Sequence, residues 1–366
     1  MKHNRLYTLS SQIKVLVVDD SAFMRKAIKK ILESDSHIKV IGTARNGEDA
    51  LEKLRELSPD VVTLDISMPH MDGLSALRHI MSESPVPVVM LSSLTQEGAL
   101  ETFEALELGA VDFVPKPSGT ISLDIDKQKN EIITKVKAAA FAELENIKRA
   151  KPEVVEQPPV AISKRKIYTA VSDKTVAIGV STGGPQTLMK IIPYLPGDLP
   201  ASILIVQHMP PGFTSAFAER LNQNSQLEIK EAEAGDVVEK GKGYLAPGDY
   251  HMTVVKRTLG KGTIIRLSKE PSNILHRPSV DVMMSSVAKV YGKNAVGVIL
   301  TGMGSDGAKA MVELKRRGGK TIAQDEASSI IFGMPKAAIE MDCVDKVVSV
   351  RGMAQAIVRA VKGEPK

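Results

Sequence analysis

Short apolar runs alternate with segments of helical period through the first third of this chain. The apolar runs cover residues 13–18, 61–64, 86–91 and 111–114, and the helical segments cover residues 21–34, 47–57, 73–82 and 98–107. Such alternation predicts a parallel sheet with helices on both faces, which is a doubly wound α/β fold.

Polar residues follow the apolar runs of this region. They are Asp19 and Asp20, Asp65, Ser92 and Lys116. Because the carboxyl ends of parallel strands gather at one edge of a sheet, we expect these side chains to lie together. Three neighbouring carboxylates repel one another, and a hard cation such as Mg²⁺ compensates them. With a lysine and a hydroxyl nearby, the set suits transfer of a phosphoryl group to a carboxylate.

This module, residues 12–140, resembles a response-regulator receiver domain, whose fold is flavodoxin-like. The resemblance implies that Asp65 accepts the phosphoryl group. It also implies that Mg²⁺ is held by Asp19, Asp20, Asp65 and the backbone carbonyl of Ser67. By the same resemblance, Ser92 and Lys116 sense the phosphoryl group, Phe113 changes rotamer on activation, and the Lys116–Pro117 bond is cis.

A linker is predicted over residues 141–173. Residues 127–150 have helical spacing, so the last helix of the first module is expected to run long. Pro152, Pro158 and Pro159 then stand among charged and small residues without apolar period. This composition indicates an extended spacer, and a passive tether is favoured over a docking motif.

The second module, residues 174–366, begins with an apolar strand that runs into a glycine-framed turn. Gly179, Ser181 and Gly183 fit the G-x-S-x-G pattern, in which a sharp turn after a strand exposes a serine hydroxyl. Glycine-rich turns after strands also cradle phosphates. The stretch alone therefore leaves open a nucleophile or an anion site.

A nucleophilic serine needs a base and an orienting acid at neighbouring strand ends. Among the histidines of this module, His208 directly follows an apolar strand over residues 202–207, whereas His251 and His276 lie in polar surroundings typical of surface loops or substrate contacts. Asp306 lies in a glycine-rich loop after a strand over residues 295–300. It is the candidate acid, although it could also cap the helix that follows.

Four motifs of this module resemble the chemotaxis protein-glutamate methylesterase (CheB) family. They are the segments at residues 181–184, 207–210, 277–281 and 300–307. The resemblance implies a second doubly wound α/β domain that hydrolyses γ-glutamyl methyl esters on chemoreceptors and deamidates receptor glutamines.

The same resemblance implies residue roles and partners. Ser181 is the nucleophile, His208 the base and Asp306 the orienting carboxylate; the Met303 amide contributes to the oxyanion hole and Thr182 lines the site. The partners are methyl-accepting chemoreceptors and a chemotaxis histidine kinase. No cofactor is expected for the hydrolase step, and the unphosphorylated receiver is expected to limit access to Ser181.

Composition narrows the remaining possibilities. The net charge of +5 is mild, and no basic recognition helix follows residue 174. We therefore expect no nucleic-acid binding, and this argues against a transcriptional regulator.

No apolar run reaches the roughly 18 residues of a membrane span. The single Cys343 favours a reducing compartment. We expect a cytoplasmic monomer. The alternative to the hydrolase is a phosphorylation-gated receptor-binding module.

Overall fold

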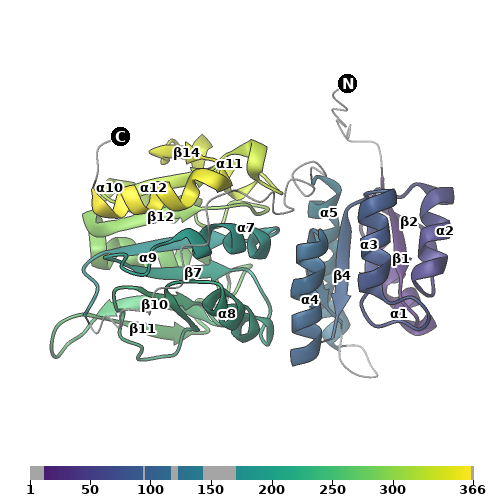
Figure 1. Ribbon diagram of the computed structural model, residues 1–366, viewed down its shortest axis with the longest axis horizontal. Coiled ribbons are helices and arrows are strands. Elements are labelled where there is room, and N and C mark those ends of the chain that lie inside the picture. Colours follow the sequence, from purple (N-terminus) through teal and green to yellow (C-terminus); the bar gives the residue numbers. More distant parts are fainter. Residues whose placement is uncertain (1–11, 94, 117–122, 143–169, 364–366) are drawn as a thin grey trace. The chain divides into compact units, whose positions relative to one another are not determined.

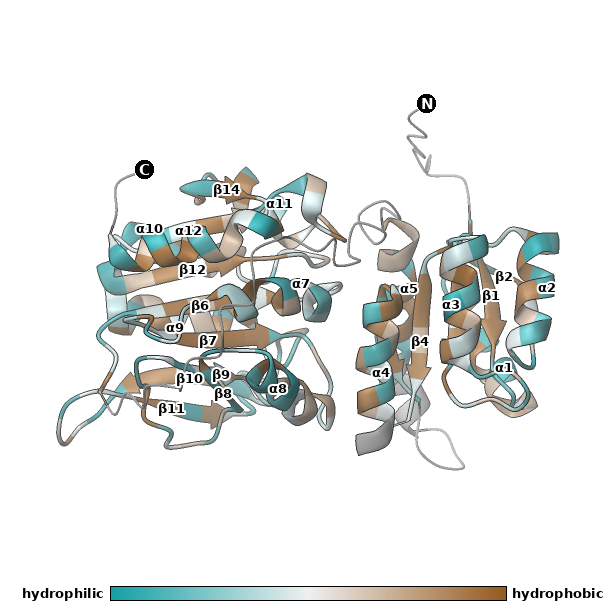
Figure 2. Cartoon of the chain, viewed as in Figure 1, coloured by the Kyte–Doolittle hydropathy of each residue, from teal (hydrophilic) through white to brown (hydrophobic). Residues whose placement is uncertain are grey.

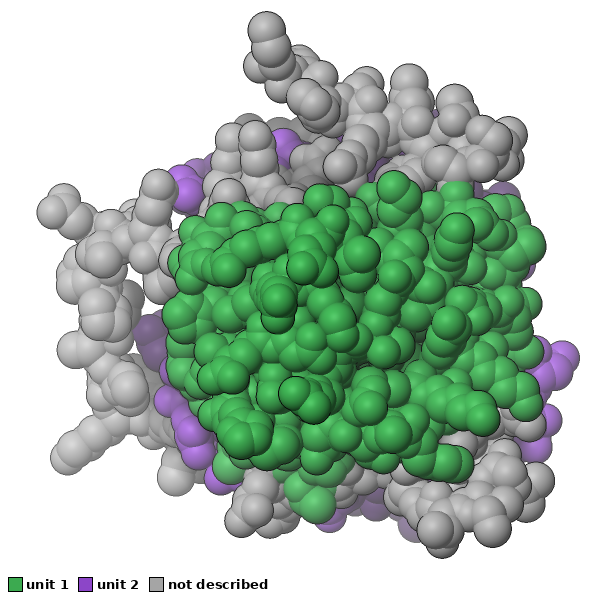
Figure 3. All heavy atoms as spheres, turned by 90° about the vertical axis from the view of Figure 1, so that its right-hand side faces the viewer, with its two compact units in different colours: residues 1–151 green, residues 152–366 purple. Residues whose placement is uncertain are grey.

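The computed structural model describes residues 12–93, 95–116, 123–142 and 170–363. The chain divides into two compact units, Met1–Lys151 and Pro152–Lys366, which Figure 3 colours separately. Most of the predicted linker and the predicted cis peptide at Lys116–Pro117 lie outside the described residues. The predicted extension of the last helix beyond residue 142 also lies outside them.

The first unit contains a parallel sheet of five strands in the order β2-β1-β3-β4-β5 (Figure 1). The strands are β1 Ile13–Val18, β2 Ile38–Ala44, β3 Val61–Asp65, β4 Val88–Ser92 and β5 Asp112–Pro115. The helices are α1 Ala22–Leu32, α2 Gly47–Leu57, α3 Gly73–Glu83, α4 Gln96–Leu108 and α5 Leu123–Ala140. Helix α1 packs beside α5, while α2 packs against α3 and α3 against α4.

Side-chain caps explain why these helices begin close to the predicted positions. An oxygen of each N-cap accepts a hydrogen bond from the amide three residues on, at Ser21, Asn46, Asp72 and Thr95. Strand β2 is absent from the predicted segments. It lies at the sheet edge and is only partly buried, so it lacks the continuous apolar run that marks β3 and β4.

The second unit contains a parallel sheet of seven strands in the order β14-β13-β12-β6-β7-β9-β8, and a separate antiparallel hairpin. The sheet strands are β6 Thr175–Val180, β7 Ser202–Gln207, β8 Glu228–Glu231, β9 Lys242–Leu245, β12 Ala295–Ile299, β13 Lys320–Gln324 and β14 Lys346–Val348; the hairpin strands are β10 His251–Lys256 and β11 Thr263–Ser268. The helices are α7 Gly184–Ile191, α8 Phe213–Gln223, α9 Val280–Tyr291, α10 Ala308–Arg316, α11 Met334–Glu340 and α12 Val350–Lys362, with short 3-10 turns at Ile192–Tyr194, Gly292–Asn294 and Glu326–Ser328.

The three central strands of this sheet end at one level. Strand β6 is flanked by β7 on one side and β12 on the other, with Val180 opposite Gln207 and Ile299 opposite Gly179. All three strands are buried along their whole length. The loops that follow them therefore meet at the carboxyl edge, where the chain order of the sheet changes direction and α/β proteins bind ligands.

Hydropathy follows the layers of both units. In Figure 2, strands such as β4, β7 and β12 are brown, and helices such as α2, α8 and α12 carry teal faces. Within the described residues, no helix is both long and apolar enough to cross a bilayer.

The buried aromatic rings of α8 should contribute strongly to the stability of the second unit. Phe217 is fully buried, and its replacement in Phe217→Ala should lower the free energy of unfolding by about 3–5 kcal/mol because it leaves a cavity. Urea unfolding followed by circular dichroism measures this loss. Tyr194→Ala removes a ring that is 57% exposed and should change stability far less. Equal losses in the two variants would contradict this packing.

Candidate active site

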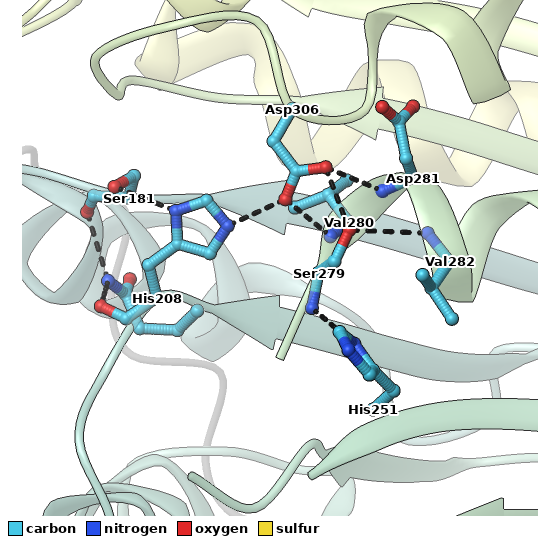
Figure 4. Close-up of polar contacts among 9 residues, drawn as sticks. Ser181, His208, His251, Ser279, Val280, Asp281, Val282 and Asp306 are labelled. Atoms are coloured by element: carbon cyan, nitrogen blue, oxygen red, sulfur yellow. Dashed lines mark hydrogen bonds and ion pairs between the residues drawn. The ribbon is translucent and has the colours of Figure 1, made fainter. Parts of the chain in front are cut away.

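Three side chains from separate loops form one chain of hydrogen bonds at the carboxyl edge of the second sheet (Figure 4). Ser181 follows β6, His208 follows β7, and Asp306 lies in the loop after β12. His208 Nδ1 lies 3.1 Å from Ser181 Oγ, and His208 Nε2 lies 2.8 Å from Asp306 Oδ2. The structure thus brings together the three residues singled out from the sequence.

The ionised carboxylate determines which ring nitrogen of His208 carries a proton. Asp306 can only accept a hydrogen bond at His208 Nε2, so Nε2 carries the proton and donates. In the neutral imidazole, His208 Nδ1 is then the acceptor and can take the hydroxyl proton of Ser181. This arrangement has the geometry of a nucleophile, a base and an orienting acid.

Asp306 is held by the first turn of α9. Its carboxylate accepts hydrogen bonds from the backbone amides of Val280 at 2.7 Å and Asp281 at 2.9 Å. These donors lie at the positive end of the helix dipole, which stabilises a negative charge. Burial alone would raise the pKa of Asp306. The hydrogen bond from His208, the positive charge that His208 carries when it is protonated, and these two amides together lower the pKa to about 2. Asp306 is therefore ionised at neutral pH.

The sequence left open that Asp306 caps its own following helix, and this interpretation is wrong. The N-cap of α10 is Gly307, which makes no side-chain cap hydrogen bond. The Asp306 carboxylate instead accepts hydrogen bonds from backbone amides at the start of α9, a helix that begins 26 residues earlier in the chain. This tertiary contact is the reason that the local pattern misled.

Ser279 is a further member of the site that sequence reasoning did not assign. It is fully buried, it caps α9, and its hydroxyl donates to Asp306 Oδ1 at 2.9 Å. Asp306 thus accepts hydrogen bonds at both carboxylate oxygens. The motif at residues 277–281 contained this serine, but only the fold reveals what it contacts.

The two other histidines of the second module, His251 and His276, both contact residues of the site. His251 begins β10 and is 1% exposed, so its expected place in a surface loop is wrong. Its Nδ1 accepts the Ser279 amide at 3.2 Å, and its Nε2 lies 3.1 Å from the Pro271 carbonyl. The ring of His276 stacks on that of His208, with centroids 4.2 Å apart. His276 therefore covers one face of the imidazole that contacts Ser181.

The Met303 amide, which the resemblance assigns to the oxyanion hole, belongs to a loop beside Ser181. A side chain at Gly302 would come within 2.7 Å of Ser181 Cβ, so the loop that carries Met303 lies directly against the serine. The Gly302 carbonyl accepts hydrogen bonds from the amides of Gly333 and Met334 at 3.1 and 2.8 Å. In a trans peptide the N–H points opposite to the carbonyl, so the Met303 N–H points away from α11. Within the described residues, neither this amide nor that of Thr182 has an acceptor.

A second cluster of functional groups lies in the first unit. Ligand oxygens of Asp19, Asp20 and Asp65 all lie within 4.8 Å of one another. A pocket of about 430 Å³, lined in part by Asp20 and Ser67, opens beside them. Three carboxylates at this spacing match the oxygen ligands that Mg²⁺ prefers, so the three predicted carboxylate ligands fit the ion.

Lys116 provides the positive charge of this cluster. Its Nζ lies 2.9 Å from Asp19 Oδ2 and 2.6 Å from Asp65 Oδ2. Burial, together with the neighbouring charge of Asp19, raises the pKa of Asp65 to about 6 in spite of Lys116. The cluster therefore carries excess negative charge that a divalent cation would offset.

Two of the three predicted switch residues of the receiver, Ser92 and Phe113, are buried. The Ser92 hydroxyl lies at the end of β4, where it donates to the Gly98 carbonyl at 3.0 Å and accepts from Thr102 at 2.7 Å. Phe113 is 2% exposed, and Lys135 lies over its ring at 4.8 Å from the centroid.

The low pKa of Asp306 makes part of the stability depend on pH. A carboxyl whose pKa is depressed on folding stabilises the folded protein at pH values above 3.8, which is its pKa in the unfolded chain. This contribution disappears as the pH falls toward about 2, its pKa in the folded protein. The difference in unfolding free energy between wild type and Asp306→Asn should therefore shrink by about 1 kcal/mol between pH 5 and pH 3. Urea titrations at both pH values measure it. A difference that grows as pH falls would contradict the assignment.

Comparison with known proteins agrees with both units. Residues 176–357 match the family described as CheB methylesterase, and residues 15–124 match the response regulator receiver domain. A protein-glutamate methylesterase/protein-glutamine glutaminase of Pyrococcus abyssi is 53% identical over 96% of this chain and 94% of its own length. The protein of that name from Halalkalibacterium halodurans is 49% identical over 97% of this chain and all of its own.

Among solved structures, the CheB methylesterase catalytic domain of Thermotoga maritima is 43% identical to this chain, with a TM-score of 0.50. The match covers 52% of this chain and 99% of that domain. Both the sequence matches and the order of the two α/β units agree with the resemblance inferred from the motifs. The chain belongs to the CheB methylesterase family and carries an N-terminal receiver domain.

Proposed function

We propose that this protein is a protein-glutamate methylesterase and protein-glutamine glutaminase that acts on methyl-accepting chemoreceptors. The observation that carries the proposal is the continuous path from Ser181 through His208 to the ionised Asp306, with contacts of 3.1 and 2.8 Å. The names of the relatives support the substrate. An anion cradle without reactivity would not require a base aligned on the serine.

The first half of the reaction forms an acyl-enzyme. His208 Nδ1 takes the proton of Ser181 as its Oγ attacks the ester carbonyl carbon. The amides of Met303 and Thr182 would donate to the oxyanion, and Asp306 stabilises the imidazolium that forms. The tetrahedral intermediate then collapses, the ester C–O bond breaks, and the proton on Nδ1 passes to the departing methoxy oxygen to give methanol.

The second half of the reaction regenerates the enzyme. Water gives a proton to His208 Nδ1 and attacks the acyl carbon, and collapse returns that proton to Ser181 and frees the glutamate side chain. A glutamine amide follows the same path, with ammonia as the first product. One acyl-enzyme therefore serves both activities.

The receiver would regulate this site through a phosphoryl group on Asp65, supplied by a chemotaxis histidine kinase. Asp19, Asp20, Asp65 and the Ser67 carbonyl would hold Mg²⁺, which neutralises charge during phosphoryl transfer. Lys116, Ser92 and Phe113 would respond to the phosphoryl group. Phosphorylation then favours the state in which receptors reach Ser181. The boundaries at 12–140, 141–173 and 174–366 stay predictions of the sequence.

Removal of the nucleophile should abolish ester hydrolysis. Ser181→Ala should lower methanol release from methylated receptor membranes by at least about 10³-fold, because no acyl-enzyme can form. Gas chromatography of released methanol measures the rate. Ser215→Ala, an exposed serine of α8, is the matched control and should release methanol at the wild-type rate. Turnover by Ser181→Ala close to that of wild type would rule out the serine mechanism.

Phosphorylation of Asp65 should raise the rate of methanol release. Acetyl phosphate with Mg²⁺ should stimulate the wild type and Asp198→Asn, an exposed carboxylate of the second unit, to the same extent. Asp65→Asn should not respond, and excess EDTA should remove the response of the wild type. The proposed regulation would be wrong if Asp65→Asn were stimulated like the wild type.

A further inference from the structure

We propose that Gln207 is a positioning residue for the reaction, which fixes the peptide that joins Ser181 to Thr182. This inference rests on the proposed function. Gln207 is the last residue of β7 and directly precedes His208. It is 3% exposed, so it is unavailable to a protein substrate and can act only through its neighbours.

The side-chain amide of Gln207 joins the backbones of the nucleophile and the base. Its Nε2 donates to the Ser181 carbonyl at 3.0 Å and to the His208 carbonyl at 3.1 Å. These two bonds use both of its N–H groups. The amide thus holds the ends of β6 and β7 at a fixed separation, just where their catalytic side chains begin.

The bond to Ser181 also sets the direction of a neighbouring amide. A peptide group is planar, and in the trans form its N–H points opposite to its carbonyl. Because the Ser181 carbonyl is bound by Gln207 and by the Gly184 amide at 2.8 Å, the Thr182 N–H points away from both. The next carbonyl along, that of Thr182, accepts from Thr301 Oγ1 at 3.0 Å and so fixes the following peptide.

The two candidate oxyanion amides are therefore oriented by different means. The Met303 peptide is held through the Gly302 carbonyl by backbone amides at the start of α11, which no side-chain substitution removes. The Thr182 peptide depends in part on the side chain of Gln207. Of these supports, only the Gln207 contact can be removed by a side-chain substitution.

A glutamine is a poor choice here if packing is its only role. Gln207 Oε1 is buried and has no hydrogen-bond partner within the described part of the chain. An unpaired buried oxygen costs stability, and a methionine would fill similar space without that cost. The Nε2 contacts offer a reason for the amide. The absence of a side chain at Gly184 leaves room for the Gln207 amide, because a Cβ at position 184 would lie 1.9 Å from Gln207 Oε1.

Gln207→Met tests the inference in the full-length protein. We expect kcat for methanol release to fall at least about 10-fold with KM within about twofold, because loss of a whole oxyanion donor costs 10²–10³ and a misdirected donor costs part of that. The affinity for an alkyl trifluoromethyl ketone, which forms a tetrahedral adduct with serine, should fall by a similar factor. Gly184→Ala, which displaces the amide by a second route, should shift both quantities in the same direction.

Gln226→Met is the matched control, because Gln226 accepts the Gly197 amide at 3.3 Å in a loop outside the site. It should keep the wild-type kcat and inhibitor affinity. Wild-type kcat in folded Gln207→Met would overturn the inference while leaving the proposed function intact. Losses of kcat and inhibitor affinity in Gln226→Met as large as those in Gln207→Met would also overturn it. A fall in the thermal stability of Gln207→Met without a change in its kcat would do the same. If the wild type released no methanol that depends on Ser181, the proposed function would fail and this inference with it.

Discussion

The contact between the Asp306 carboxylate and His208 Nε2 is the interaction on which the site depends. It requires a carboxylate that stays ionised while largely buried, and the first turn of α9 supplies two backbone amides and the Ser279 hydroxyl for that purpose. Without these donors, burial would favour the neutral acid, which could no longer fix the proton on Nε2. A proton fixed on Nε2 leaves Nδ1 as the acceptor for the Ser181 proton, and the reactivity of Ser181 depends on that acceptor.

Strand order explains why residues so far apart in sequence can meet. Strand β6 is central, and its neighbours β7 and β12 end level with it, so three loops open at the same edge of the sheet. The receiver uses the same principle: Asp19 and Asp65 follow or end neighbouring parallel strands, and Lys116 follows a third. In both units the backbone brings interacting polar side chains together at strand ends, and different side chains then support different chemistry.

The sequence was sufficient where local patterns determine the outcome. Apolar runs identified the buried strands β1, β3, β6, β7 and β12, and the helices of the first unit begin where capping residues precede them. It was insufficient where distant contacts decide. Edge strand β2 lacks a continuous apolar run, and His251 is buried by packing that its polar neighbours in sequence do not reveal. The partner of Asp306 is α9, which no local pattern around residue 306 indicates.

Reaction with a fluorophosphonate, followed by mass spectrometry of the digested protein, tests the central claim most directly. The reagent reacts much faster with a serine that a neighbouring base activates than with an ordinary serine. The account predicts one adduct, on the peptide containing Ser181, which is lost in His208→Ala and strongly slowed in Asp306→Asn. Labelling at another residue, or undiminished labelling of Ser181 in His208→Ala, would contradict it.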